Sequence, residues 1–143
     1  MKKKILIKGS NGFLGNLAKE YFNQNYELVS VDLSSSRDAN FYQVDIGNFS
    51  EIDDIITKEK PNIIFHFASE IFDTHNKKKI YKTNVEGSSN IKKSAIKNNI
   101  ENLIFTSTFS LYEKNYDYLI SGCSLFAKFS AFDAGLSISI ADL

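Results

Sequence analysis

The sequence predicts an α/β fold, a three-layer, doubly wound parallel sheet of about six strands. Short apolar runs rich in Ile, Val and Phe alternate along the chain with amphipathic segments of helical period. Three glycines, Gly9, Gly12 and Gly15, separate the first apolar run from the first amphipathic segment. Strands that alternate with helices form parallel sheets with helices on both faces, so these observations favour this architecture.

Composition narrows the class of protein. The chain has 143 residues, with 17 basic and 17 acidic residues and a hydrophobic fraction of 43%. These values are typical of one soluble domain, expected over residues 1–143, and zero net charge gives no reason to expect a nucleic-acid partner. Cys123 is the only cysteine, and no apolar run reaches the length of about 18 residues that spans a membrane. We expect a cytoplasmic protein with no membrane partner.

The first unit is a strand, a glycine turn and a helix. The strand is expected at Ile5-Leu6-Ile7, and the glycines allow the backbone to turn sharply and to approach a ligand closely. The open amides of a helix N-terminus favour an anion, so this unit predicts a pyrophosphate site. A glycine turn without a ligand would show the same spacing. The helix is expected to bury one stripe, formed by Leu14, Leu17, Ala18, Tyr21 and Phe22.

A second strand is expected from Tyr26 to Asp32. An acid about 20 residues after such glycines accepts hydrogen bonds from the adenosine ribose, which indicates a Rossmann-type fold. A carboxylate at Asp32 would repel a 2′-phosphate, so NAD is favoured over NADP. Arg37 lies close enough in sequence to make this preference for NAD weaker. An aspartate at a strand end can also cap its own turn, and both interpretations of Asp32 stand here.

The next elements are shorter. Phe41–Val44 is expected as the third strand, and a helix is expected from an N-cap at Ser50 to the stop at Lys60-Pro61-Asn62. Its buried stripe comprises Ile52, Ile55 and Ile56. The nearly continuous apolar run Ile63–Ala68 is typical of a central parallel strand. His66 lies inside that run without a second ligand at metal spacing, so a core histidine is predicted.

A long helix is expected from Asn76 to Asn98, followed by a strand at Asn102–Ser107. The buried face of the helix would comprise Ile80, Tyr81, Asn84, Val85, Ser88, Ile91, Ala95 and Ile96. Its lysines are expected to form a solvated face. Beyond Thr108 the periodicity weakens: residues 109–124 suit a loop over a site, a helix is expected at Ser124–Asp133 and a last strand at Leu136–Ile140.

These motifs together resemble one family. Residues 3–112 are similar to the extended short-chain dehydrogenases, specifically the NAD-dependent epimerase/dehydratase family that acts on nucleotide sugars. The matching motifs are Gly9, Gly12 and Gly15 with Asn11-Gly12-Phe13-Leu14, then Asp32, Asp45-Ile46, His66-Phe67-Ala68-Ser69, Asn84-Val85-Glu86-Gly87, and Phe105-Thr106-Ser107-Thr108 before Tyr112.

The resemblance implies roles for individual residues. It implies NAD as the cofactor and, if the chain is active, a nucleotide sugar as the partner. Thr108 would lie against the reacting hydroxyl of the substrate. The implied cofactor-binding residues are Gly9, Asn11, Gly12, Phe13, Leu14, Gly15, Asp32, Asp45, Ile46, Phe67, Ala68, Ser69, Asn84 and Thr106.

One part of the family pattern is missing. The family reaction needs a tyrosine to take the hydroxyl proton, and a lysine four residues later on the same helix face lowers the tyrosine pKa. No tyrosine here is followed by such a lysine: Tyr112, Tyr116 and Tyr118 are followed by Tyr, Ile and Gly. Lys128 could be the lysine, with Ser124 in the tyrosine's place; in the other alignment Ile120 takes that place. Both alignments lose the base.

The family also continues into a C-terminal portion that closes over the substrate, which we expect to be absent here. An active enzyme would then need a wall from a partner chain, which leaves a homo-oligomer open. Three hypotheses remain: a nucleotide-sugar epimerase/dehydratase relative whose ancestral reaction is NAD-linked oxidation of a sugar hydroxyl, a non-catalytic dinucleotide-binding sensor or regulatory module, and the product of a truncated gene.

Overall fold

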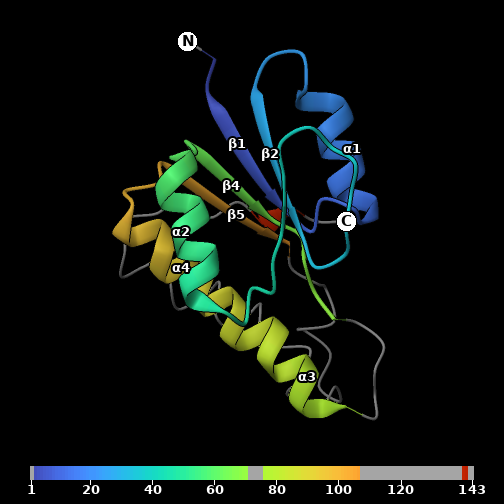
Figure 1. Ribbon diagram of the computed structural model, residues 1–143, viewed down its shortest axis with the longest axis vertical. Coiled ribbons are helices and arrows are strands. Elements are labelled where there is room, and N and C mark those ends of the chain that lie inside the picture. The colour runs from blue at the N-terminus through green and yellow to red at the C-terminus, as the bar shows by residue number, and fades with distance from the viewer. Residues whose placement is uncertain (1, 71–75, 107–139, 142–143) are drawn as a thin grey trace.

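The computed structural model describes residues 2–70, 76–106 and 140–141. Its centre is a six-stranded sheet with the strand order β3-β2-β1-β4-β5-β6, and every neighbouring pair is parallel (Figure 1). The predicted doubly wound parallel sheet is therefore confirmed. The strands are β1 (Lys4–Lys8), β2 (Glu27–Asp32), β3 (Phe41–Gln43), β4 (Ile63–His66), β5 (Asn102–Thr106) and β6 (Ile140–Ala141).

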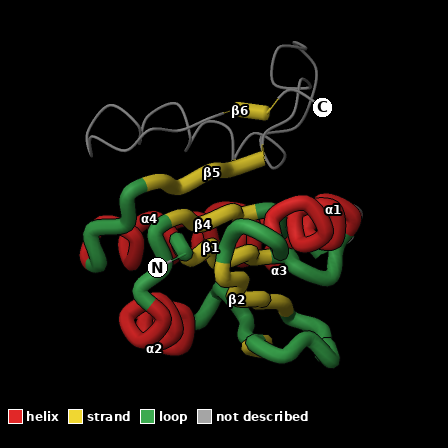
Figure 2. Tube along the Cα trace, turned by 90° about the horizontal axis from the view of Figure 1, so that it is seen from above, coloured by secondary structure: helices red, strands yellow, loops and turns green. Residues whose placement is uncertain are grey.

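Helices cover both faces of the sheet, which completes the three layers. Figure 2 shows α1 on one side of the strands and α2 with α4 on the other. Two core clusters agree with this view: one joins β1 to α1, and the other joins the sheet to α2 and α4. The helical segments are α1 (Phe13–Phe22), α2 (Phe49–Glu59), α3 (Lys77–Tyr81), the π-helical η1 (Lys82–Gly87) and α4 (Ser88–Lys97).

Strand β1 contributes to both core clusters because successive side chains point to opposite faces. Ile5 and Ile7 pack in the cluster on the α1 side, whereas Leu6 packs in the cluster on the α2 and α4 side. All three are fully buried. The same alternation directs Lys8 to the face that Leu6 occupies, at the carboxyl end of the strand.

The stripe predicted for α1 is wrong at two positions. Leu17 is 47% exposed and Tyr21 is 77% exposed, and the buried residues of α1 are Gly15 and Ala18. Leu17 and Tyr21 are exposed because α1 approaches the glycine turn closely. This approach turns the small residues of α1, and not its large ones, toward the backbone of the turn and the sheet. The face bearing Gly15 and Ala18 then lies against the sheet, and Phe22 completes the contact from the last turn.

Several element boundaries differ from prediction by one or two residues. Helix α2 has Asn48 as its N-cap rather than Ser50, and it ends at Lys60, which adopts the left-handed conformation (φ 48°) immediately before Pro61. A left-handed residue followed by proline is a common helix ending. Strands β3 and β4 each end before the predicted residue, because ladder pairing stops where the chain enters the loops at the carboxyl edge. Strand β5 is described as far as Thr106, and Ser107, the last residue predicted for it, lies outside the described residues.

The helix predicted from Asn76 to Asn98 is present, but it contains a π-helical turn in its middle. Asn76 is the N-cap, with its Oδ1 accepting a hydrogen bond from the amide of Lys79 at 3.1 Å. Tyr81 (49% exposed) and Ile96 (45% exposed) lie at the edge of the buried face and not within it, contrary to prediction. The lysines of these segments are mostly exposed, as expected for a solvated face.

His66 is a core residue, as predicted. It is 2% exposed, and its Nε2 lies 3.0 Å from the hydroxyl oxygen of Ser88 on α4. Burial lowers its pKa to about 3, with a smaller contribution from the charge of Lys8. The ring is therefore neutral at physiological pH.

The predicted loop at 109–124, the helix at 124–133 and residues 136–139 of the last predicted strand lie outside the described residues. Strand β6 includes Ile140, the last residue of that predicted strand, and pairs with β5 from Phe105. Within the described ranges, no helix combines the length and apolar character needed to cross a membrane.

Candidate functional site

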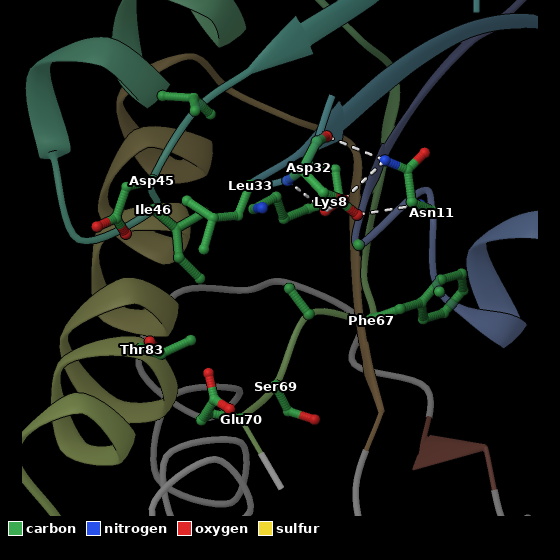
Figure 3. A pocket seen from close by; sticks show the side chains of 15 residues that line it. Lys8, Asn11, Asp32, Leu33, Asp45, Ile46, Phe67, Ser69, Glu70 and Thr83 are labelled. Carbon is green, nitrogen blue, oxygen red and sulfur yellow. Dashed lines mark hydrogen bonds between the residues drawn. The ribbon is translucent and has the colours of Figure 1, made fainter. Parts of the chain in front are cut away.

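A pocket of about 370 Å³ opens at the carboxyl ends of β1, β2 and β4 (Figure 3). Strand order reverses between β1 and β4, and open α/β sheets bind ligands in the crevice at such a point. The pocket size suits a small-molecule site. Its lining comprises Lys8, Gly9, Asn11, Gly12, Asp32, Leu33, Ser34, Val44, Asp45, Ile46, Phe67, Ala68, Ser69, Glu70 and Thr83.

The turn between β1 and α1 requires glycine at two positions. Gly9 has a φ of +87°, and a Cβ there would lie 2.7 Å from the amide nitrogen of Ala68. A Cβ on Gly15 would lie 2.2 Å from the carbonyl oxygen of Gly9. The glycines thus allow the first turn of α1, the β1–α1 loop and the end of β4 to pack backbone against backbone, which closes one wall of the pocket.

The N-terminus of α1 opens at this wall without a side-chain cap. Gly12 is the N-cap residue and has no side chain to accept hydrogen bonds from the first turn. Its own amide donates to the carbonyl of Gly9 at 3.1 Å. The amides of Phe13 and Leu14, in the first turn of α1, have no acceptor within the helix itself. Unsatisfied amides at the positive end of a helix dipole favour an anion.

Asp32 ends β2 beside this loop. Its Oδ2 accepts from the amide of Asn11 at 3.0 Å, and its Oδ1 accepts from the amide and hydroxyl of Ser34 at 3.1 and 3.0 Å. Burial acts to raise the pKa of Asp32, but these hydrogen bonds outweigh it and hold the pKa below its usual value. Asp32 caps its own turn and also lines the pocket. A carboxylate has about four lone-pair sites, so one remains for a ligand hydroxyl.

Asp45 and Ile46 form the far side of the pocket. The amide of Gly47 donates to Asp45 Oδ1 at 2.8 Å and lowers the Asp45 pKa, and Lys82 lies 3.4 Å from Oδ2. The side-chain amide of Asn90 donates to the carbonyl oxygen of Ile46 at 2.8 Å. The Ile46 side chain, 2% exposed, leaves no room for a Cβ on Gly87. Contacts from η1 and α4 therefore hold this loop in place.

The loop after β4 is held by Asn84 of η1. Asn84 Oδ1 accepts from the amide of Glu70 at 2.8 Å, and its Nδ2 donates to the carbonyl of Glu70 at 3.0 Å. Asn84 itself is 7% exposed and does not line the pocket. It acts on the site by fixing the chain beyond Phe67, Ala68 and Ser69. π-helical turns occur often at functional sites, and this one presents Thr83 to the pocket.

The structure brings most of the predicted cofactor residues together. Those that line the pocket are Gly9, Asn11, Gly12, Asp32, Asp45, Ile46, Phe67, Ala68 and Ser69. Those that do not are Phe13, Leu14, Gly15, Asn84 and Thr106. The Phe13 ring is 79% exposed and outside the lining, so a contribution of Phe13 to the site would come from its backbone amide. Thr108 and Lys128, the residues proposed for catalysis, lie outside the described residues.

Sequence analysis missed six lining residues, which are Lys8, Leu33, Ser34, Val44, Glu70 and Thr83. Lys8 carried a signal: it is a charged residue at the end of an apolar strand, directly before the glycine turn. The others follow or precede recognised motifs and have no distinctive chemistry. No group of three His, Cys, Asp or Glu side chains suited to a metal ion occurs among residues 2–70 and 76–106.

Comparison with known proteins places this site in context. Residues 5–124 match the sequence profile of the NAD dependent epimerase/dehydratase family. The chain is 32% identical to CDP-paratose 2-epimerase of Salmonella typhi over 127 residues, which cover 76% of this chain and 38% of that protein. It is 28% identical to Protein CapI of Staphylococcus aureus over 132 residues, covering 78% and 40% of the two chains.

Solved structures share the fold. UDP-glucose 4-epimerase of Thermotoga maritima, crystallised with UDP-glucose, superposes with a TM-score of 0.83 at 26% identity. The superposition covers 96% of this chain and 54% of that one. WbmG of Bordetella bronchiseptica, solved with NAD, gives a TM-score of 0.83 at 18% identity and covers 96% and 52%. The chain thus matches only about half, or less, of each of these proteins.

Proposed function

The chain belongs to the NAD-dependent epimerase/dehydratase family, and on this premise we propose that it binds NAD in the pocket at the carboxyl edge of the sheet. The observation that carries the proposal is the convergence of two groups on one crevice. The uncapped N-terminus of α1 favours a pyrophosphate, and Asp32 offers an acceptor to a ribose hydroxyl.

The residues present fit this cofactor. Gly9 and Gly15 let the glycine turn pack tightly against the loop after β4 and the first turn of α1. The amides at the start of α1 would bind the oxygens of a pyrophosphate. The ionised carboxylate of Asp32 would hold a 2′-hydroxyl and repel a 2′-phosphate, which favours NAD over NADP. Asp45 and Ile46 would border the adenine, as the family resemblance implies, and the loop from Phe67 to Ser69 would lie along the middle of the cofactor.

The proposed reaction of the lineage is NAD-linked oxidation of a hydroxyl group on a nucleotide sugar. NAD, when bound, would supply the hydride acceptor for this oxidation. The described residues of this chain bind and orient the cofactor at one edge of the sheet. The proton of the sugar hydroxyl needs a base, which would come from Tyr116, Tyr118 or a neighbouring subunit. Thr108 and Lys128 remain the other candidates for the substrate side of the site.

A second candidate function is a non-catalytic dinucleotide-binding module, such as a redox sensor or a regulatory subunit. One observation favours it: no tyrosine in the sequence is followed four residues later by a lysine. The hydroxyl of Ser124 is far less acidic than a phenol and would not replace the tyrosine without another base. A non-catalytic module would use the glycine turn and Asp32 to bind the dinucleotide, and it would need no proton acceptor.

Calorimetric titration of the chain with NAD and NADP tests NAD binding, which both candidate functions require. We expect saturable binding of NAD and weaker binding of NADP. Ala68→Phe would fill the pocket wall and weaken NAD binding at least about tenfold, because a bulky side chain would overlap the ligand volume. Ala39→Phe, at an exposed position outside the lining, is the matched control and should bind as the unsubstituted chain does. Absence of NAD binding would overturn the proposal.

Turnover assays with a panel of nucleotide sugars separate the two candidates. We expect little activity. Turnover that is lost in Thr108→Ala would favour the enzyme, and a chain that binds NAD but converts none of the sugars would favour the sensor. Turnover that survives replacement of Tyr116 and Tyr118 would require a different base.

A further inference from the structure

Lys8 is a buried lysine at the wall of the pocket. It is 3% exposed at the carboxyl end of β1, and it lines the crevice. Lysine is almost never so deeply buried without a partner, because removing an ammonium group from water costs free energy. Its neighbour Ile7 has no such cost. The position therefore needs an explanation beyond packing.

No close ion pair within the described part of the chain accounts for Lys8. The ion pairs with N–O distances up to 4.0 Å there involve other lysines. Asp32 on β2 and Asp45 after β3 act on Lys8 electrostatically, and both carboxylates are already engaged by backbone amides. The cross-strand neighbour His66 is neutral. Lys8 thus remains available to a ligand.

Lys8 lies at one particular end of the pocket. In Figure 3 its side chain extends from the end of β1 toward the side that Asp45 and Ile46 line, away from Phe67 and Ser69. Among the described residues, the charged members of the lining are Lys8, Asp32, Asp45 and Glu70, and Lys8 is the only cation of these four. A dinucleotide carries two negative charges on its pyrophosphate. A pocket lined by acids alone would repel it.

We infer that Lys8 is a cofactor-binding residue whose ammonium group contacts the adenosine moiety of the bound dinucleotide and offsets the charges of Asp32 and Asp45. The inference rests on the proposed NAD binding and adds a contact to it. Adenine ring nitrogens and ribose oxygens are acceptors that an ammonium group can reach. A hydrogen bond from a charged donor to such an acceptor changes affinity by roughly ten- to a hundredfold.

Stability separates this role from a structural one. A lysine kept for ligand binding carries the cost of its burial in the free protein, so Lys8→Met, which has a similar length and no charge, should melt at the same temperature or higher. A lysine that the fold needs would behave oppositely, because its replacement would remove the favourable charge interaction with Asp32 and Asp45. Thermal unfolding without ligand distinguishes the two.

The test titrates NAD and ADP into the unsubstituted chain, Lys8→Met and Lys8→Gln. We expect both variants to weaken NAD and ADP by the same factor, about tenfold or more, because the contact lies in the half that both ligands share. Lys93→Met, on the exposed surface of α4, removes the same charge away from the pocket and should bind normally. Lys8→Gln keeps a polar side chain, so it still tests the role of the charge if Lys8→Met does not fold.

A pH titration gives a second readout. Burial lowers the pKa of Lys8 from 10.5, while Asp32 and Asp45 oppose the shift. NAD affinity of the unsubstituted chain should therefore fall as pH rises toward the lysine pKa, and this fall should be absent in Lys8→Met. Asp32 and Asp45 stay ionised and His66 stays neutral over that range.

The outcomes are distinguishable. Unchanged NAD binding in Lys8→Met would overturn the role of Lys8 and leave the proposed function intact. Failure of the unsubstituted chain to bind NAD or ADP would overturn the proposed function, and the inference about Lys8 with it. A lower melting temperature for both Lys8 variants without ligand would assign Lys8 to the fold and contradict the inference.

Discussion

The backbone amide of Asn11 donates a hydrogen bond to Oδ2 of Asp32, with the two atoms 3.0 Å apart. This bond joins the glycine turn after β1 to the carboxyl end of β2. The two sequence motifs that indicated a dinucleotide site are therefore one physical unit. A change in the carboxylate affects ligand binding directly and also through the shape of the turn.

Replacement of Asp32 by Asn should weaken NAD binding about tenfold and NADP binding less. Loss of the charge weakens the hydrogen bond to a ribose hydroxyl and also removes repulsion of a 2′-phosphate. Calorimetry with both dinucleotides measures the two constants. Asp38→Asn is the matched control, because Asp38 lies in the same loop, pairs with Lys19 and is outside the pocket lining. An equal loss for NAD and NADP would show that Asp32 does not distinguish them.

Gly15→Ala should destabilise the protein by roughly 3 kcal/mol, because the added methyl would lie 2.2 Å from the carbonyl oxygen of Gly9 and backbone would have to move. Gly12→Ala is the comparison. A Cβ at Gly12 meets only one atom at 3.3 Å, and the change should cost much less. Chemical denaturation of both variants measures the difference. Similar losses of unfolding free energy in the two variants would mean that the backbone of the turn can move to accommodate the methyl group at Gly15.

Asp53 should stabilise the packing of α2 on α4. Its Oδ2 pairs with Lys97, and its Oδ1 accepts from the Ser94 hydroxyl at 2.7 Å. Removal of the carboxylate in Asp53→Ala should lower the free energy of unfolding by about 2 kcal/mol at pH 7. The value is kept this small because Lys97 is exposed and water screens its ion pair with Asp53. Asp54→Ala, exposed on the same helix, should cost little.

The pH dependence of the Asp53 contribution follows from its pKa. The hydrogen bond from Lys97, with those from Ser94 and Asn98, lowers the folded-state pKa below 3.8. The carboxylate thus stabilises the fold above the unfolded-state pKa, and this contribution is lost as pH falls through the folded-state value. The difference in unfolding free energy between the unsubstituted chain and Asp53→Ala should therefore shrink below about pH 4. A constant difference down to pH 2 would contradict this assignment.

His66 should make the fold sensitive to mild acid. Its pKa is about 3 in the folded chain and 6.5 when unperturbed, so below pH 6.5 the unfolded chain takes up a proton that the folded chain does not. The free energy of unfolding should then fall by about 1.4 kcal/mol for each pH unit from this residue alone.

Replacement of His66 by Gln tests this expectation. Glutamine keeps a partner for Ser88 and does not titrate. Between pH 6.5 and 5 the unsubstituted chain should lose about 2 kcal/mol more than His66→Gln, measured by denaturant unfolding at each pH. Equal losses of unfolding free energy in the two proteins would show that residues other than His66 cause the acid sensitivity.

Sequence patterns predicted the doubly wound parallel sheet well because most of its strands are short apolar runs with glycine, proline or acidic residues at or near their ends. They failed on α1, where Leu17 and Tyr21 lie on the exposed side. Helical periodicity identifies a stripe of apolar residues but not which edge of it faces the sheet. That choice depends on how closely the helix approaches the glycine turn, which is a tertiary contact.

The candidate site was predictable where a motif has a distinctive residue type. The glycines allow a sharp turn, and the carboxylate of Asp32 can accept hydrogen bonds from a ribose, so chemistry explains these predictions. Asp45 was predicted only through the family resemblance. Lys8 was missed because its role depends on strand alternation and on two acids that follow it by 24 and 37 positions in sequence. Thr83 was missed because the π-helical turn that presents it has no sequence signature.

The position of the pocket at one edge of a parallel sheet also determines how the molecule can be handled. Strand β1 begins at the opposite edge, roughly 15 Å from its carboxyl end for a strand of this length, and Figure 1 shows how it runs between the two edges. A tether joined ahead of β1 would leave the crevice open to solution. The chain can thus be anchored by its N-terminus to a biosensor surface without blocking the entry of a dinucleotide.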